Sequence, residues 1–254
     1  MPTPEIQKLN EQHTDEAIAA RIAATTQHGF VGDFVLGGVD GAITTFAIVA
    51  GVAGANYPVG VALVLGVANV LADGFSMAVS NYLKVRADKQ VLEQYRRMEE
   101  FHITHLPDRE REEIRQIFAA KGFSGELLEQ VVETICDDQQ RWVDTMLVEE
   151  WGLQIAPPSP WKAGLVTFCG FLLAGAVPLL PLPLMYWGVD RDEVFALCAI
   201  VTMVAFALIG VFRGKVVGHS TLVSVVETVA TGGLAAAIAY GAGVLLERLV
   251  GGSG

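Results

Sequence analysis

The sequence predicts an all-α integral membrane protein with five transmembrane helices and a three-helix cytoplasmic insert between the second and third of them. Hydrophobic residues make up 52% of the 254 residues, and the mean hydropathy is +0.44. Charged residues make up only 18%, where a soluble domain carries about 25%. The charge is also uneven, because 9 of the 17 basic and 16 of the 28 acidic residues lie between Arg86 and Glu150.

Five segments hold the roughly 20 mostly apolar residues that a membrane helix needs. They are residues 34–55, 59–83, 162–183, 192–212 and 223–246. Glycine occurs in all five, and small residues of this kind are common where helices pack closely in lipid. Short connections lie at 56–58, 184–191 and 213–222.

The basic residues near the span ends predict the orientation of the chain. With five spans, the following all fall on one side: Lys84, Arg86, Lys89, Lys162, Arg213 and Lys215. Positive residues mark the cytoplasmic side of membrane proteins. The N-terminus and the insert are therefore predicted to be cytoplasmic, and the C-terminus to lie outside.

Four regions follow from this plan: a cytoplasmic N-terminal segment (1–33), a transmembrane hairpin (34–84), a cytoplasmic helical domain (85–160) and spans three to five (161–250). In the insert, the first predicted helix continues out of span two to about Thr104. Pro107 starts the second, because proline is tolerated in a first helical turn and breaks a helix interior. Ser124 is a candidate N-cap for a third helix over 125–153.

Charge and cysteine content exclude some classes of function. The net charge of −11 argues against a nucleic-acid partner, which would need basic patches, and suits a protein that handles cations. The three cysteines form no metal-binding spacing, and their odd number suggests no disulfide framework. The N-terminus lacks the basic and apolar regions of a cleaved signal peptide, so the first span is predicted to act as an uncleaved anchor.

Apart from Asp192 and Glu193 at the very start of the fourth predicted span, three acidic residues lie inside the spans: Asp40, Asp73 and Glu227. A charge at the bilayer centre costs about 2.5–3.5 kcal/mol on insertion scales, and such residues usually mark an ion or proton route. The alternative is a neutral carboxylic acid that only ties helices together, and Glu227 could simply lie at the membrane interface.

Asp40 and Met77 are both predicted to lie about 9 Å below the cytoplasmic surface, from the helical rise of 1.5 Å per residue. The hairpin allows them to face each other, and Asp73 lies one turn deeper than Met77 on the same helix face. A carboxylate beside a thioether suits Fe²⁺ better than Mg²⁺ or Ca²⁺. We therefore predict a transport pathway at Asp40, Asp73 and Met77, although a lone methionine is more often a packing residue.

The insert carries three pairs of possible metal ligands at helical spacing: Glu99 and His102, Glu110 and Glu113, and Met146 and Glu150. Residues three or four apart share a helix face. Carboxylates at such spacing on neighbouring helices resemble helical di-iron sites. The alternative is a set of solvated charged faces, which is common on acidic helices.

Four motifs in this chain resemble signatures of the vacuolar iron transporter family: GGVDGAITTFAIVAGVAGA in span one, LADGFSMAVSNYL in span two, WVDTMLVEEWGL before span three and VPLLPLPL within it. Their order and spacing agree with the family from about His28 onward. The resemblance implies a homodimer with the pathway along the dimer axis. It places Asp40 and Met77 on that pathway.

The resemblance also implies that the cytoplasmic domain binds metal through Glu99, Glu110, Glu113, Met146 and Glu150. The chain departs from the family pattern at two positions. His102 stands where the family has Glu, and Asn81 replaces a residue that is usually acidic in the second-span signature.

These observations predict a transporter, not an enzyme, that exports Fe²⁺ from the cytoplasm in exchange for protons, with Mn²⁺ or Zn²⁺ as further candidate ions. The expected setting is lipid, in the cell membrane of a prokaryote or a vacuole-type membrane of a eukaryote. The alternatives are a membrane-anchored ferroxidase or metal-storage protein, whose cytoplasmic helices would do the chemistry, and a metal sensor or scaffold. Carboxylates inside the spans argue against both alternatives, because a membrane anchor does not need them.

Overall fold

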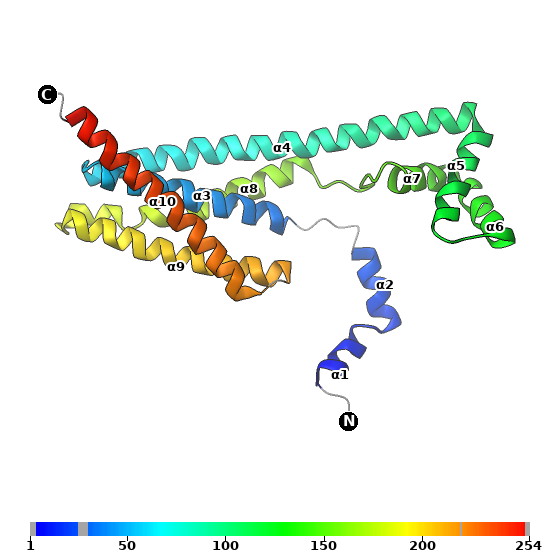
Figure 1. Cartoon of the computed structure of the whole chain (residues 1–254), viewed down its shortest axis with the longest axis horizontal. Coiled ribbons are helices and arrows are strands. Elements are labelled where there is room, and N and C mark those ends of the chain that lie inside the picture. The colour runs from blue at the N-terminus through cyan, green and yellow to red at the C-terminus, as the bar shows by residue number, and fades with distance from the viewer. Residues whose placement is uncertain (1–3, 25–29, 219, 252–254) are drawn as a thin grey trace. The chain divides into compact units, whose positions relative to one another are not determined.

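A computed structural model describes residues 4–24, 30–218 and 220–251, and every regular element in these ranges is a helix (Figure 1). The α-helices are α1 (Pro4–Glu11), α2 (Asp15–Ala24), α3 (Val31–Gly54), α4 (Val59–His105), α5 (Pro107–Ala120), α6 (Gly125–Cys136), α7 (Gln139–Glu149), α8 (Pro160–Gly175), α9 (Arg191–Val217) and α10 (Thr221–Gly251). Two 3₁₀ helices, η1 (Val177–Leu179) and η2 (Leu182–Trp187), follow α8. Residues 25–29 of the predicted N-terminal segment, His28 among them, lie outside the described residues.

Five helices are long and apolar enough to cross a membrane, which confirms the predicted number of spans. They are α3, α4, α8 with its two 3₁₀ helices, α9 and α10. The third differs in detail from the predicted α-helix over 162–183. Its α-helix ends at Gly175, because the prolines at 178, 181 and 183 lack the N–H that an α-helix requires.

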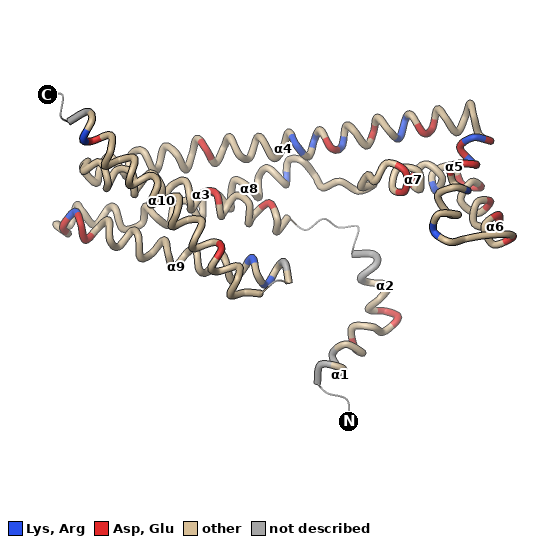
Figure 2. The backbone as a smooth tube through the Cα atoms, viewed as in Figure 1, with Lys and Arg blue, Asp and Glu red and all other residues tan. Residues whose placement is uncertain are grey.

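The chain folds into two compact units, and α4 contributes residues to both. One unit contains residues 29–83 and 160–254, which include the apolar stretches of all five spans. The other contains residues 1–28 and 84–159, and we call its part from 84 to 159 the insert. Figure 2 shows the acidic and basic residues gathered along the C-terminal half of α4 and on α5, α6 and α7, with few along the spans.

In the span unit, α3 packs against both α8 and α10. Glycines make both contacts close. A Cβ at Gly170 of α8 would lie 2.4 Å from the backbone oxygen of Phe34, and one at Gly243 of α10 would lie 2.2 Å from that of Gly51. Small residues are the usual means by which helix backbones approach closely in lipid. The glycine content noted in the sequence therefore serves helix packing around α3.

Gly170→Ala is expected to destabilise the span unit, because the added methyl group meets backbone that cannot move aside as a side chain would. Overpacking of this kind typically costs about 1–3 kcal/mol. The matched control is Gly233→Ala on α10, where an added Cβ meets no atom within 4 Å. Thermal unfolding in detergent should show a lower midpoint than the wild type for Gly170→Ala and an unchanged midpoint for Gly233→Ala. Equal midpoints for the two variants would contradict this account of the packing.

The turn predicted at 56–58 is confirmed, but the connections predicted at 184–191 and 213–222 are partly helical, because η2 reaches Trp187 and α9 covers Arg191–Val217. Asn56, in the turn between α3 and α4, takes the left-handed conformation with φ of 56°. Arg213 and Lys215 were predicted in a connection over 213–222, but α9 continues to Val217, so both lie in its last turns.

The insert contains four helical segments where three were predicted. The helix predicted to continue out of span two is present: α4 runs without interruption to His105, and Pro107 then begins α5. The single helix predicted over 125–153 is wrong. Asp138 has extended backbone angles, and its side chain accepts a 2.8 Å hydrogen bond from the N–H of Arg141, which starts α7 as a new helix. Ser124 does precede α6, but its side chain makes no capping hydrogen bond.

The insert has its own hydrophobic core, which every one of its helices helps to form. Ile114, Val132, Met146 and Leu147 are each fully buried at its centre. This core fixes the positions of α4, α5 and α7 relative to one another, and with them the acidic side chains described below.

Candidate metal centre

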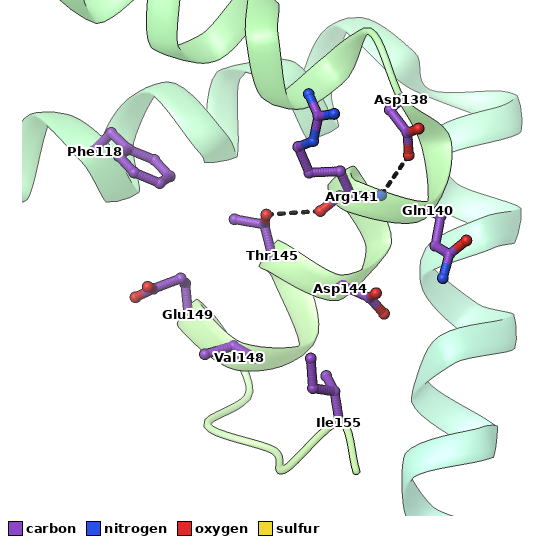
Figure 3. A pocket seen from close by; sticks show the side chains of 9 residues that line it. All are labelled: Phe118, Asp138, Gln140, Arg141, Asp144, Thr145, Val148, Glu149 and Ile155. Carbon is purple, nitrogen blue, oxygen red and sulfur yellow. Dashed lines mark hydrogen bonds between the residues drawn. The ribbon is translucent and has the colours of Figure 1, made fainter. Parts of the chain in front are cut away.

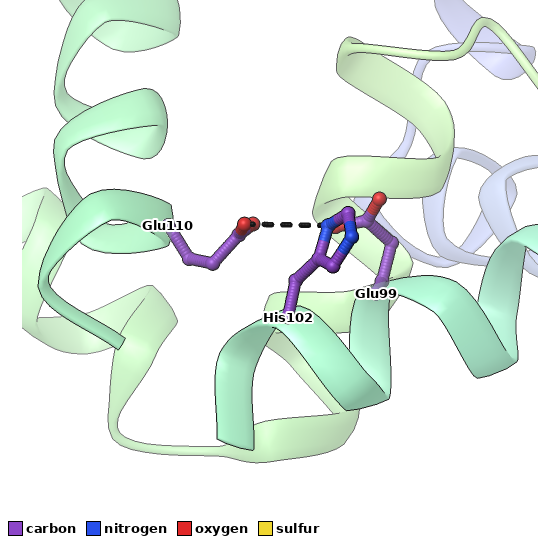
Figure 4. Close-up of side chains that lie close together, drawn as sticks. All are labelled: Glu99, His102 and Glu110. Atoms are coloured by element: carbon purple, nitrogen blue, oxygen red, sulfur yellow. Dashed lines mark ion pairs between the residues drawn. The ribbon is translucent and has the colours of Figure 1, made fainter. Parts of the chain in front are cut away.

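Three of the predicted ligands meet in the insert, where Glu99 and His102 of α4 face Glu110 of α5 (Figure 4). One possible ligand atom from each residue lies within 4.8 Å of those of the other two. The Nδ1 atom of His102 and Oε1 of Glu110 are 3.5 Å apart. Two carboxylates and an imidazole at this separation form a suitable donor set for a divalent transition-metal ion.

The two carboxylates of this group are buried with unsatisfied oxygens. Glu99 is 1% exposed and Glu110 is 4% exposed. With both groups ionised, Oε2 of Glu99 and Oε2 of Glu110 have no hydrogen-bond partner. Buried charged groups are normally paired or bound to a metal. A cation, or a proton held between the two carboxylates, would satisfy these oxygens.

Glu113 and Glu150 extend this group, although the sequence spacing alone could not show it. The pKa of Glu110 is raised to about 7, chiefly by burial, then by the negative charges of Glu113, Glu99 and Glu150 and by a hydrogen bond with Glu99. The pKa of Glu150 is also raised to about 7, by burial and then by the charges of Glu99 and Glu113. The four carboxylates are therefore close enough to repel one another, and a divalent cation would relieve that repulsion.

Met146, the sixth predicted ligand, lies in the core of the insert. Its side chain is fully buried among the apolar residues of α4, α5, α6 and α7. Its backbone oxygen accepts hydrogen bonds from the N–H groups of Glu150 and Trp151, at 3.0 and 3.3 Å. Met146 thus helps to place Glu150 through its backbone oxygen.

A separate groove in the insert does not involve these ligands (Figure 3). Its lining residues are Phe118, Asp138, Gln140, Arg141, Asp144, Thr145, Val148, Glu149 and Ile155. Its carboxylates already have partners: Asp138 caps α7, Asp144 pairs with Arg96 at 2.5 Å, and Glu149 pairs with Lys121. These pairings leave the groove less suited to a metal ion than the group around Glu99.

In the span unit, a row of polar side chains lies between α3 and α4. Asp73 is close enough to Asp40 to act on it electrostatically. One turn along α3, the hydroxyl of Thr44 donates to the backbone oxygen of Asp40 at 2.9 Å and accepts from the amide of Asn69 at 3.3 Å. Asn69 and Asp73 are one turn apart on α4. Met77, one turn beyond Asp73, is half-buried.

The sequence profile of the VIT family matches residues 31–244. The chain belongs to the VIT family. It is 34% identical over 235 residues to a protein of Toxoplasma gondii named vacuolar iron transporter, an alignment that covers 89% of this chain and 77% of that one. It is 33% identical over 242 residues to vacuolar iron transporter 1 of Eucalyptus grandis, with 93% and 92% of the two chains covered.

Vacuolar iron transporter 1 of Tulipa gesneriana is 29% identical over 243 residues, which cover 94% of this chain and 93% of that protein. The match to the VIT family confirms the resemblance drawn from the four sequence motifs. Its named members are transporters, so this is a family of transporters and not of enzymes.

Asn81, which the resemblance places at a usually acidic position, has two partners that sequence reasoning missed. The Asn81 amide donates to the carboxylate of Asp33 and to the hydroxyl of Thr167, each at 2.8 Å. Asn81 is 8% exposed and Thr167 is fully buried. An acidic residue at 81 could not donate to Asp33 unless it were protonated. The amide therefore joins α3, α4 and α8 with no added charge.

Glu227, the third carboxylate predicted inside the spans, is exposed on α10 and pairs with Arg213 of α9 at 3.2 Å. This pairing agrees better with the interface position that the sequence left open than with a buried ion route. The one feature of the sequence that indicated this ion pair was the basic stretch at 213–215.

Proposed function

We propose that this protein moves Fe²⁺ out of the cytoplasm in exchange for protons, and that Mn²⁺ and Zn²⁺ are further substrates. The observation that carries the proposal is the buried group of Glu99, His102 and Glu110, with two unsatisfied carboxylate oxygens, in a chain whose relatives are named vacuolar iron transporters. Nitrogen and carboxylate ligands together favour these ions over Mg²⁺ and Ca²⁺.

In this proposal the insert captures the metal and the spans carry it. Glu99, His102, Glu110, Glu113 and Glu150 form the capture site, and Met146 supports it. Asp40, Asp73 and Met77 line the route through the membrane. Support comes from the proximity of Asp40 to Asp73 and from the polar row that Thr44 and Asn69 add beside them. Two neighbouring carboxylates can exchange a divalent cation for protons, because either a bound cation or bound protons remove the repulsion between their negative charges.

The functional unit in this proposal is a homodimer. Support comes from α4, on which four small residues one turn apart are exposed: Ala68, Ala72, Ser76 and Ser80. Large apolar side chains flank them, with Val64 and Phe75 exposed by 69% and 64%. A small-residue stripe of this kind allows two helices to approach closely in lipid.

The proposed setting is a vacuole-type membrane, or the cell membrane of a prokaryote, with the N-terminus and the insert in the cytoplasm. Single cysteines at Ala120, Tyr57, Gly188 and Arg248, each in a chain with its own cysteines replaced, test this orientation. With the chain in a bacterial cell membrane, we expect an impermeant thiol reagent added to intact cells to label positions 57, 188 and 248 and to leave position 120 unlabelled. Labelling of positions 120 and 248 from the same side would contradict the five-span orientation.

The transport experiment uses the purified chain in proteoliposomes, with Fe²⁺, Mn²⁺ or Zn²⁺ on the insert side and a pH gradient imposed in either direction. We expect metal movement that speeds up when protons flow the opposite way, together with a pH change when metal alone is added. Metal binding without any movement would instead favour the membrane-anchored storage or ferroxidase function, in which the spans serve only as anchors.

A further inference from the structure

We propose that Trp151 is a positioning residue that makes Glu99 a one-oxygen ligand and so biases the insert site toward transition-metal ions and against Ca²⁺. This inference rests on the proposed capture of metal at Glu99. It concerns a residue that lies beside the predicted ligand Glu150 but was not itself a candidate ligand.

Trp151 holds Glu99 through a direct hydrogen bond. The indole N–H donates to Oε1 of Glu99 at 2.9 Å, and Oε2 of the same carboxylate has no partner. Glu99 itself is 1% exposed, so water cannot readily replace this bond. The two oxygens of Glu99 are therefore different: one is bound to the protein, and the other is free to bind a ligand.

The position of Trp151 is set by its ring and by its backbone. The ring contacts that of Tyr95, one turn before Glu99 on α4, with centroids 4.4 Å apart. Gly152 follows with φ of 63°, which reverses the chain after α7, and the N–H of Leu153 bonds to the oxygen of Leu147 at 2.8 Å. Glycine adopts such angles at little cost, because it has no Cβ. The Trp-Gly-Leu sequence thus places the indole over Glu99.

A hydrogen bond to one carboxylate oxygen affects the binding of Ca²⁺ and of transition-metal ions differently. Ca²⁺ takes six to eight oxygen ligands and often uses both oxygens of a carboxylate. Transition-metal ions accept imidazole nitrogen together with carboxylate oxygen. The bond from Trp151 weakens Oε1 as a second ligand and leaves Oε2, which has no hydrogen-bond partner, as the oxygen of Glu99 that can bind a metal ion. A one-oxygen Glu99 with an imidazole suits the transition metals and leaves Ca²⁺ short of ligands.

Trp151→Phe in the full chain tests this role, because phenylalanine keeps a ring against Tyr95 and removes the N–H. Mn²⁺ and Ca²⁺ are the probes, and their affinities are measured by calorimetry in detergent. Loss of the N–H makes Oε1 available as a second ligand for Ca²⁺, so we expect the ratio of Mn²⁺ to Ca²⁺ affinity to fall about tenfold. The matched control is Trp142→Phe in the same insert core, since the N–H of Trp142 has no partner.

An infrared difference spectrum between metal-bound and metal-free protein gives a second readout. The separation of the two carboxylate stretching bands differs between one-oxygen and two-oxygen coordination, and Glu99→Gln identifies the band that belongs to Glu99. We expect the Mn²⁺ spectrum to show one-oxygen coordination in the wild type and a shift toward two-oxygen coordination in Trp151→Phe.

The possible failures are distinguishable. If the wild-type chain binds no Mn²⁺, the proposed capture site, on which the inference rests, is wrong. Mn²⁺ binding with an unchanged affinity ratio and an unchanged Glu99 band in Trp151→Phe would overturn the role of Trp151 alone. An equal loss of affinity for both ions, also seen in Trp142→Phe, would assign both tryptophans to the stability of the core.

Discussion

Asp40→Asn is expected to abolish metal-driven proton movement and to reduce metal transport at least tenfold, about 1.4 kcal/mol in the barrier. Asparagine keeps the size of aspartate but neither carries a charge nor titrates. Thr44 donates to the backbone oxygen of residue 40 and accepts from Asn69 of α4, and neither bond uses the side chain of Asp40, so the contact between α3 and α4 is expected to survive. The measurement is metal uptake and pH change in proteoliposomes, with thermal unfolding to confirm that the variant is folded.

Two further variants make this test specific. Asp40→Glu should keep part of the activity, because it restores a titratable charge. Asp192→Asn is the matched control, since Asp192 lies in the same unit, pairs with Arg191 and has a side chain that is 84% exposed. Transport by Asp40→Asn at a near wild-type rate would rule out Asp40 as the exchange group and move that role to Asp73.

Metal binding by the insert should weaken by about 100-fold or more between pH 8 and pH 6. Glu110 and Glu150 both have a pKa of about 7, and a metal ion binds the ionised forms. Below pH 7 the metal must displace a proton from each, and each proton contributes a factor of about 10 over this range. Calorimetric titration of the full chain with Mn²⁺ at several pH values measures the slope.

Glu110→Gln should lower the affinity and reduce the pH effect by a factor of about ten, because the metal no longer has to displace a proton from residue 110. Glu112→Gln is the control: Glu112 lies two residues away, and hydrogen bonds from Gln116 and Arg115 lower its pKa. The same pH slope in the wild type and in Glu110→Gln would show that Glu110 is not a ligand.

The same carboxyl groups predict the stability of the metal-free insert. A raised pKa means that the folded state holds protons that the unfolded state has already released between about pH 4.5 and 7. Stability therefore decreases as pH rises through this window, since the unfolded state binds fewer protons. Bound metal should remove much of this loss, which denaturation at pH 5 and pH 8 with and without Mn²⁺ would measure.

The membrane architecture could be predicted from the sequence because its signals are local. Each span is a run of about 20 apolar residues, and the insert is a run of charged ones, so neither depends on which helix packs against which. The continuous α4 and the start of α5 at Pro107 were predicted for the same reason. The break before α7 was missed, because two acidic residues inside an amphipathic pattern can be either solvated or capping, and only the bond from Arg141 to Asp138 distinguishes these roles.

Helical spacing predicted three pairs of possible ligands in the insert, but an acidic helix offers many such pairs. The tertiary structure decided which carboxylates are buried, because the insert core brings Glu99 of α4 against Glu110 of α5. It also decided contacts with no signal in the sequence: the indole of Trp151 on a carboxylate 52 residues away, and the amide of Asn81 on Asp33. Spans and ligand types follow from composition and periodicity, whereas pairing, burial and hydrogen-bond direction arise only when distant helices meet in a packed core.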